Sequence, residues 1–234
     1  KNYGFRVGDN VLNNGTLNNL SYNLNFSRSS AGPSLIFPTY GSEFSFGVKA
    51  TFPYSLFTDK SYDEPANLTA VAQNDFLADK YKWLEYYKFN AKGKWYTSFT
   101  DKLVLMTNAE FGFLGFYNED LGQTPFERYF VGGDGIAQFQ LDGRETVGLR
   151  GYENNRLSSI AGGTIYNKFQ LELRYSITDA PSASIYTLGF LEAGNSYDNF
   201  DEYNPFNVKR SAGLGVRIFM PAFGLLGIDF AHGF

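Results

Sequence analysis

The sequence predicts an all-β protein, a transmembrane antiparallel β-barrel portion built from about eight strands. Three observations predict this class. Apolar residues recur at every second position in one segment after another, these segments are mostly about 10 to 14 residues long, and short and long connections alternate between them. Crossing a bilayer at a tilt takes roughly 9 to 11 residues per strand, whereas strands of soluble sheets average about 5 to 6. Strand length therefore favours the membrane class.

The first half of the chain contains four predicted strands. In residues 20–26, Leu, Tyr, Leu and Phe alternate with Ser and Asn, and in residues 44–52 a Phe, Phe, Val, Ala and Phe series alternates with Ser, Gly, Lys and Thr. Two longer alternating segments follow, from about Tyr87 to Phe99 and from Leu103 to Tyr117. Residues 1–19 are rich in Asn and weakly periodic, so they are expected to be a loop or the end of an earlier strand.

The second half contains four further strands, and its alternation is cleaner. The segment Ile165–Ile177 sets Phe, Leu, Leu and Tyr against Lys, Gln, Glu and Arg. The remaining three run from Ile185 to about Asn195, from Val208 to Met220 and from Leu225 to Phe234. Residues 20–234 are therefore interpreted as the barrel portion.

Connections between these strands alternate in length. Short links lie near residues 29–41, 100–102, 178–182 and 221–224, and long ones span about 53–86, 117–163 and 196–207. Short turns at one rim and long extracellular loops at the other are typical of outer-membrane barrels. The three long connections are accordingly predicted to be extracellular.

A soluble β-sandwich is the alternative fold, because it would also alternate and would use the same Phe and Tyr residues in its core. Its polar face would meet bulk water, and its strands would be shorter. The composition also bears on the class of protein. There are 24 Phe, 17 Tyr and 2 Trp, and the mean hydropathy is −0.28, so the chain is polar overall yet rich in aromatic rings. No apolar run reaches the 18 to 20 residues of a membrane helix.

The charge and the reactive side chains exclude several functions. A net charge of −4 provides no basic face for nucleic acid. The single histidine, His232, falls on the apolar side of the last strand, there is no cysteine, and no Ser-His-Asp order is recognisable. The glycines of 132–135 lack the following helix and Lys-Ser/Thr pair of a phosphate loop, and the acidic residues of 198–202 are expected to be solvated. We expect no enzymatic activity, no cofactor and no metal site.

Five motifs occur in a fixed order: RYFVGGDGI at 128–136, VGLRGYE at 147–153, LELRY at 171–175, GFLEAGN at 189–195 and RSAGLGVRIFMPAFGLLGIDFAHGF at the end. Together they resemble the BamA-type outer-membrane insertase family, and the resemblance covers the chain from about Leu20 onward. Members of that family carry a long sixth extracellular loop whose V/I-R-G-F/Y tip folds back inside the barrel. Each motif alone is weak, and the ordered set is what carries the resemblance.

The resemblance assigns two groups of residues. The loop tip would be Leu149, Arg150, Gly151 and Tyr152, and its partners on the inner wall would be Phe190, Glu192, Gly194 and, on the neighbouring strand, Glu172. Strand alternation independently places Phe190, Glu192 and Gly194 on one face.

An arginine inside a partly dehydrated lumen needs a fixed acceptor, because an unpaired buried charge costs about 3 to 5 kcal/mol. The family usually has Asp where Glu192 stands, so one extra methylene must be accommodated. Two plainer interpretations stay open: Arg150 as a solvated loop residue, and Glu192 as a structural carboxylate paired with an interior Lys or Arg.

The resemblance also implies an architecture and a function. Family barrels have 16 strands with the long loop between the eleventh and twelfth, so this chain would supply strands eight to fifteen, unless it closes on itself. Implied is non-enzymatic insertion of nascent β-barrel proteins into the bacterial outer membrane by lateral seam opening and strand augmentation. The implied partners are those substrates, accessory lipoprotein subunits, the bilayer and lipopolysaccharide, without nucleic acid. A two-partner secretion pore or a TamA-like translocation pore is the alternative, and an outer-membrane enzyme the third.

Overall fold

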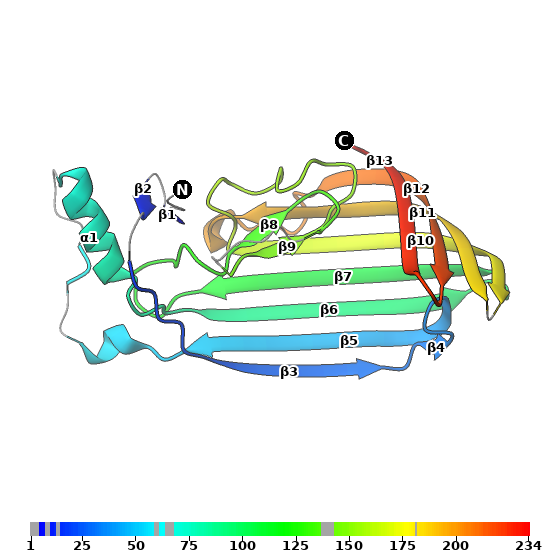
Figure 1. The fold of residues 1–234 in the computed structure, drawn as a ribbon, viewed down its shortest axis with the longest axis horizontal. Coiled ribbons are helices and arrows are strands. Elements are labelled where there is room, and N and C mark those ends of the chain that lie inside the picture. Colours follow the sequence, from blue (N-terminus) through cyan, green and yellow to red (C-terminus); the bar gives the residue numbers. More distant parts are fainter. Residues whose placement is uncertain are drawn as a thin grey trace.

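One antiparallel sheet dominates the molecule (Figure 1). The computed structural model describes residues 5–7, 10–12, 15–58, 61–63, 68–136, 143–180 and 182–234. Eight strands follow one another along the sheet, each paired antiparallel with the next, and a short ninth strand, β4, pairs with β5. The strands are β3 (Ser21–Ser29), β4 (Gly32–Pro33), β5 (Pro38–Thr51), β6 (Tyr87–Ser98), β7 (Leu103–Gly115), β10 (Ile165–Ala180), β11 (Ala183–Tyr197), β12 (Lys209–Met220) and β13 (Gly224–Gly233). The predicted all-β fold with about eight long antiparallel strands is confirmed.

The two faces of this sheet differ in chemistry, because successive residues of a strand point to opposite sides. We call the face that bears Phe169, Leu171 and Leu214 the outer face, and the face that bears Glu172 and Glu192 the inner face. Leu214 and Phe230 of the outer face are 69% and 84% exposed, whereas Glu172 and Glu192 are each 3% exposed. Exposed apolar side chains and buried carboxylates invert the pattern of a soluble protein and are typical of a sheet that meets lipid.

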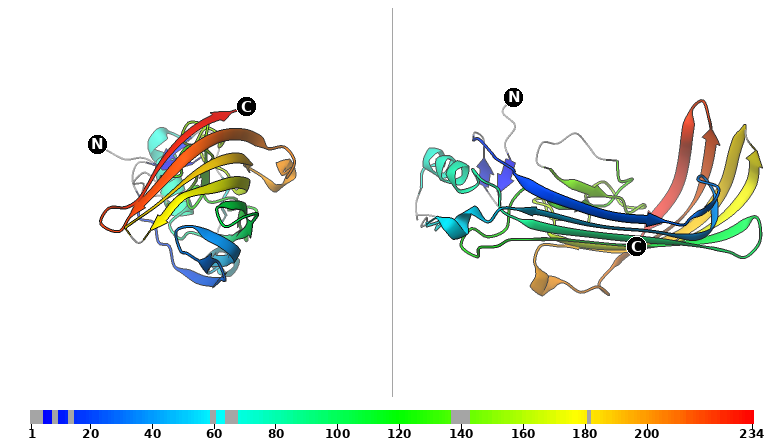
Figure 2. Two further views of the ribbon diagram at one scale, coloured as in Figure 1. Left: turned by 90° about the vertical axis from the view of Figure 1, so that its right-hand side faces the viewer. Right: turned by 90° about the horizontal axis from the view of Figure 1, so that it is seen from below.

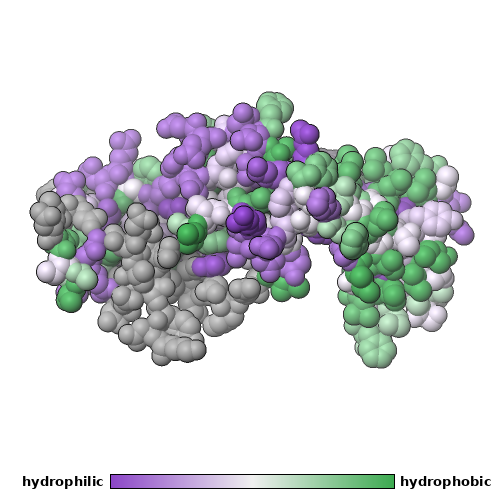
Figure 3. Space-filling view, turned by 90° about the horizontal axis from the view of Figure 1, so that it is seen from above, coloured by the Kyte–Doolittle hydropathy of each residue, from purple (hydrophilic) through white to green (hydrophobic). Residues whose placement is uncertain are grey.

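Apolar side chains gather over the right-hand part of the molecule in Figure 3, where β12 and β13 lie in Figure 1. In a β-sandwich, Leu171 and Leu214 would pack against a second sheet, yet they are 45% and 69% exposed. The sandwich alternative is therefore wrong for the described residues. No helix among them is long and apolar enough to span a membrane.

The described part of the connection between β7 and β10, residues 116–136 and 143–164, folds over the inner face, and we call it the inner loop. In the right-hand view of Figure 2 it lies above the sheet. It contains a parallel pair of short strands, β8 (Tyr129–Val131) and β9 (Glu145–Val147). Tyr129, Val131 and Leu149 of this loop join Tyr86 and Tyr166 of the sheet side in one buried cluster. The loop is thus part of the hydrophobic core rather than a solvated extension.

The other long connections also contain ordered structure. The first carries a 3-10 turn, η1 (Tyr54–Phe57), and one helix, α1 (Ala70–Lys80), which begins where the Thr69 hydroxyl accepts a hydrogen bond from the amide of Ala72. Residues 1–19 were expected to be a loop or the end of an earlier strand. Their described part contains an antiparallel pair of short strands, β1 (Phe5–Val7) and β2 (Asn10–Leu12).

The last long connection, residues 198–207, folds over the outer face, and we call it the outer flap. It contains η2 (Phe200–Glu202), which lies below the sheet in the right-hand view of Figure 2. Its aromatic rings pack edge to face against those of β7, with centroids 6.0 Å apart for Phe200 and Phe113 and 5.9 Å for Tyr203 and Phe111. The two long connections next to β10 and β11 therefore cover opposite faces of the same strands.

Candidate functional site

The tip of the inner loop reaches the inner face across β11, β12 and β13. It directly follows β9, and an isolated bridge between Leu149 and Gly133 fixes its start. Leu149 is fully buried, and its side chain lies over Gly194 of β11, where any Cβ would come within 2.8 Å of the Leu149 Cδ1. Glycine at position 194 is thus what lets the loop tip lie flat on the strand.

Arg150 binds carboxylates from three different strands. Its Nε donates to Glu192 Oε1 on β11 at 2.9 Å, and its backbone N–H donates to Glu192 Oε2 at 2.7 Å. Its Nη2 lies 2.7 Å from Glu172 Oε1 on β10, and its Nη1 lies 3.2 Å from Asp229 Oδ2 on β13. The guanidinium also lies over the Phe190 ring, 3.5 Å from its centroid. One side chain therefore links the loop to β10, β11 and β13.

The surrounding charges balance these carboxylates. Glu172 also pairs with Arg174 at 2.7 Å, and Asp229 with Arg217 at 2.7 Å. Burial by itself would lower the pKa of Arg150, but attraction by the carboxylates of Glu192 and then Glu172 outweighs it and raises the pKa of Arg150. The guanidinium stays charged at every pH at which a protein is folded. Because Glu172 and Glu192 are buried, breaking their pairs with Arg150 would leave buried charges without a partner, so the attachment is strong.

Gly151 and Tyr152 carry the contact to the end of the sheet. Gly151 has a φ of +90°, and a Cβ there would come within 2.8 Å of the backbone nitrogen of Gly233. The Tyr152 hydroxyl donates to the carbonyl oxygen of Arg210 at 2.7 Å and lies 3.1 Å from that of Phe234. The loop tip thus contacts the backbone of both β12 and the segment that follows β13.

The structure brings the two groups of residues named from the sequence into contact. Leu149 lies on Gly194, and Arg150 contacts Phe190, Glu192 and Glu172. Gly151 and Tyr152 instead contact β12 and the end of the last hairpin. Asp229 was missed as a partner, although its position between apolar neighbours of the last strand marks it as facing inward. Among the other interior cations, Lys92 pairs with Glu110 at 2.8 Å and Lys94 with Glu43 at 3.3 Å, whereas Lys168 lies 3.8 Å from Glu192 itself.

A second attachment of the inner loop was also missed. Glu127 and Glu145 of the loop lie beside Lys88 of β6, which is 4% exposed. The Lys88 Nζ lies 3.0 Å from a Glu145 carboxylate oxygen and donates to the Glu127 carbonyl oxygen at 2.9 Å, and Lys49 of β5 pairs with Glu127 at 2.7 Å. The Tyr129 ring lies 4.4 Å from the same Nζ. Alternation marks Lys49 and Lys88 as inward-facing, but no motif connects them to residues 39 or more positions away.

These side chains can attach the loop to the sheet through ion pairs and hydrogen bonds. Arginine, lysine and carboxylates form ion pairs, and no group of three or more His, Cys, Asp or Glu residues among the described positions is placed to hold a metal ion. The geometry joins one loop to six strands of a sheet: β5 and β6 at its base, and β10 to β13 at its tip.

Comparison with known proteins identifies the family. The model of the Omp85 superfamily domain matches residues 2–234. The chain belongs to the Omp85 superfamily. Omp85 proteins are non-enzymatic transporters and insertases of the outer membrane, and this locates the chain there. A search of curated protein sequences finds no match.

A solved structure has the same fold. It is BamA from Haemophilus ducreyi lacking POTRA domains 1–3, which matches with a TM-score of 0.61 and 18% sequence identity. The match covers 90% of this chain and 38% of that one. The sheet of this Omp85 chain therefore corresponds to part of a BamA barrel.

Proposed function

We propose that this chain is part of an Omp85 insertase that folds β-barrel proteins into the outer membrane. The observation that carries the proposal is the Arg150 network, which fixes the inner loop to β10, β11 and β13 at once. Removing one partner of such a buried network costs about 3 to 5 kcal/mol, so the wall it spans is stiff. A stiff wall confines opening to a seam elsewhere in the barrel.

Insertion at such a seam needs no covalent step. An incoming strand would add to an exposed strand edge, with backbone hydrogen bonds giving the affinity, while the bilayer next to the seam is thinned. The driving force is large because each unpaired backbone group in lipid costs several kcal/mol. The substrates would be unfolded β-barrel proteins, and lipoprotein subunits would assist on the periplasmic side.

A secretion pore of the two-partner or TamA-like kind is the competing proposal. Such a pore has to leave a path along its inner face. Here that face is covered by the inner loop, whose Tyr129, Val131 and Leu149 are completely buried against the sheet. This covered inner face supports insertion at the seam over passage through the middle.

The test compares both activities of the full-length protein reconstituted in vesicles. Unfolded β-barrel substrate is added, and its folding is followed by the shift in electrophoretic mobility between heated and unheated samples. We expect accelerated folding by the wild-type protein and little conductance. A large open-channel conductance, together with no acceleration of substrate folding, would refute the insertase and favour the pore.

A further inference from the structure

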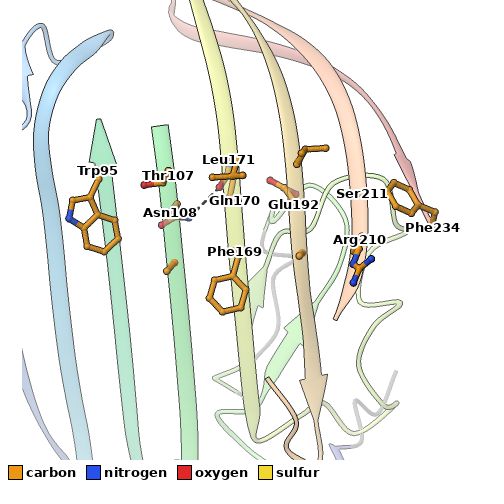
Figure 4. A pocket seen from close by; sticks show the side chains of 13 residues that line it. Trp95, Thr107, Asn108, Phe169, Gln170, Leu171, Glu192, Arg210, Ser211 and Phe234 are labelled. Carbon is orange, nitrogen blue, oxygen red and sulfur yellow. Dashed lines mark hydrogen bonds between the residues drawn. The ribbon is translucent and has the colours of Figure 1, made fainter. Parts of the chain in front are cut away.

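A furrow crosses the outer face of the sheet from β6 to β12 (Figure 4). Its volume is about 480 Å³, within the range of ligand sites. Small side chains, Thr107, Ala109 and Ala193, form its floor. Larger ones border it: Trp95, Phe169, Leu171, Leu191 and Phe234. These lining residues occupy outward positions of successive strands, so the furrow opens toward the membrane.

A second hollow of about 690 Å³ adjoins the first and shares Leu171 and Leu191 with it. Gly189 and Ala212 form part of its lining, and Leu214 and Phe230 border it. Together the two hollows make a continuous apolar depression over β10 to β13. Its shape follows from the residues that lack bulk, because larger side chains at 189, 193 and 212 would fill it.

The furrow ends abruptly at the outer flap. The next outward residues beyond Phe169 and Ala193 are Asn167 and Asn195, and their amides donate to the flap carbonyls of Pro205 at 3.2 Å and Asn207 at 2.9 Å. The outer face thus changes on both strands from purely apolar side chains to amides beside aromatic rings, since Asn167 is opposite Phe111, which contacts Tyr203. Such a change marks the border between hydrocarbon and headgroups.

Arg210 lies at this border. It pairs with Ala193 in the β11–β12 ladder, its side chain is exposed, and it lines the furrow. Among the described residues, no carboxylate pairs with its guanidinium. A cation at the headgroup level next to an apolar furrow suits one kind of ligand, a lipid with an anionic headgroup, and guanidinium matches phosphate by donating two parallel hydrogen bonds.

We propose that this furrow is a binding site for the phosphorylated, multiply acylated glycolipid of the outer leaflet, lipopolysaccharide. A phosphate of its lipid A part binds Arg210, and an acyl chain lies in the furrow over Ala109 and Ala193. The choice of leaflet follows from the position of Arg210, which lies at the end of β12 that the outer flap joins, where the long connections predicted to be extracellular emerge. The site requires the outer-membrane location but not the insertase activity.

The test measures lipid binding by the full-length protein in detergent, with native mass spectrometry as the readout. Three probes are used: lipid A with two phosphates, the same lipid dephosphorylated, and phosphatidylglycerol. The variants are Arg210→Gln, which removes the charge, Arg210→Lys, which keeps it, and Ala193→Phe, which fills the furrow. The matched control is Arg28→Gln. Arg28 is also exposed on the outer face, but it lies at the short-turn end of β3, away from the outer flap.

We expect Arg210→Gln to weaken binding of bisphosphorylated lipid A by about tenfold or more, since charge-assisted hydrogen bonds to the phosphate are lost. Ala193→Phe should also weaken this binding, because the larger side chain takes the place of the acyl chain in the furrow. Arg210→Lys should retain part of the binding, and Arg28→Gln should leave it unchanged. Mobility on unheated gels verifies that each variant is folded. Unchanged binding by Arg210→Gln, or equal binding of dephosphorylated lipid A or phosphatidylglycerol by the wild-type protein, would overturn the proposal.

Discussion

Arg150 holds three carboxylates together, and two of them, Glu172 and Glu192, are buried. Its contact with Glu192 was foreseeable from the sequence, since strand alternation places Glu192 on the inner face and the motif order pairs the two segments. Asp229 was not foreseeable as a third acceptor, because no local pattern indicates that β13 passes under the loop tip. A contact made by long-range topology leaves little trace in the sequence.

We predict that Arg150→Ala destabilises the protein by about 3 to 5 kcal/mol, because the buried carboxylates of Glu172 and Glu192 would lose a cation that both contact. The measurement is the urea midpoint of unfolding in detergent, with gel mobility as a second readout. Arg156→Ala is the matched control, since Arg156 is an exposed arginine of the same loop. Equal midpoints for Arg150→Ala and the wild type would contradict the prediction.

Gly151 gives a prediction about backbone geometry. Gly151→Ala would place a Cβ 2.8 Å from the Gly233 nitrogen and force alanine to a φ of +90°, so the loop tip should lift from β13. Gly224→Ala is a matched control, because Gly224 has a similar φ of +79° but nothing within 4 Å of its Cβ position. It should cost only the conformational penalty of about 1 to 2 kcal/mol. Thermal unfolding measures both, and a cost for Gly151→Ala no larger than that of Gly224→Ala would show that the close approach is unimportant.

At the scale of elements, the inner loop is attached to the sheet at two separate places. The base attachment at Lys88 joins β5 and β6, and the tip attachment at Arg150 joins β10 to β13. Each holds a different part of the loop, so loss of one leaves the other intact.

We predict that Lys88→Met loosens the loop base alone, because Glu127 and Glu145 lose a buried partner while the Arg150 network is untouched. Hydrogen exchange should rise around β8 and β9 and stay slow at residues 149–152. Lys102→Met, in an exposed turn, is the control. Equal acceleration across the whole loop would show instead that both attachments act as one unit.

Elements differ in how far the sequence specified them. The eight long strands were predicted because each carries its own alternation of polar and apolar residues. The helix α1 was missed because its few apolar residues give no clear helical period, and β8 and β9 are only three residues long. The acidic residues of the outer flap were expected to be solvated, and Asp201 and Glu202 are exposed. The contact of Tyr203 and Phe200 with β7 was missed, because it depends on distant residues.

At the scale of the whole molecule, the chemistry of the two faces decides where the protein can exist. The outer face exposes leucine, isoleucine and phenylalanine, and the inner face buries charges under a loop. In water such a surface would associate, whereas in a bilayer it meets hydrocarbon.

We predict a depth-dependent response to charge on the outer face. Leu214→Lys, in the middle of β12, should destabilise the folded protein in lipid by about 2 to 4 kcal/mol, and Thr97→Lys, outward-facing near the short-turn end of β6, by about 0 to 1. Folding yield into vesicles at increasing urea measures both. Equal yields for the two variants would mean that this face does not meet the hydrocarbon.

The Tyr152 contact has a consequence for how this sequence can drift. Its hydroxyl binds carbonyl oxygens of the main chain, which every amino acid supplies. Substitutions at positions 210 and 234 therefore leave the hydrogen bonds of the Tyr152 hydroxyl intact. Relatives with quite different residues in the last hairpin would retain this contact between the loop tip and the sheet, provided that they keep the tyrosine.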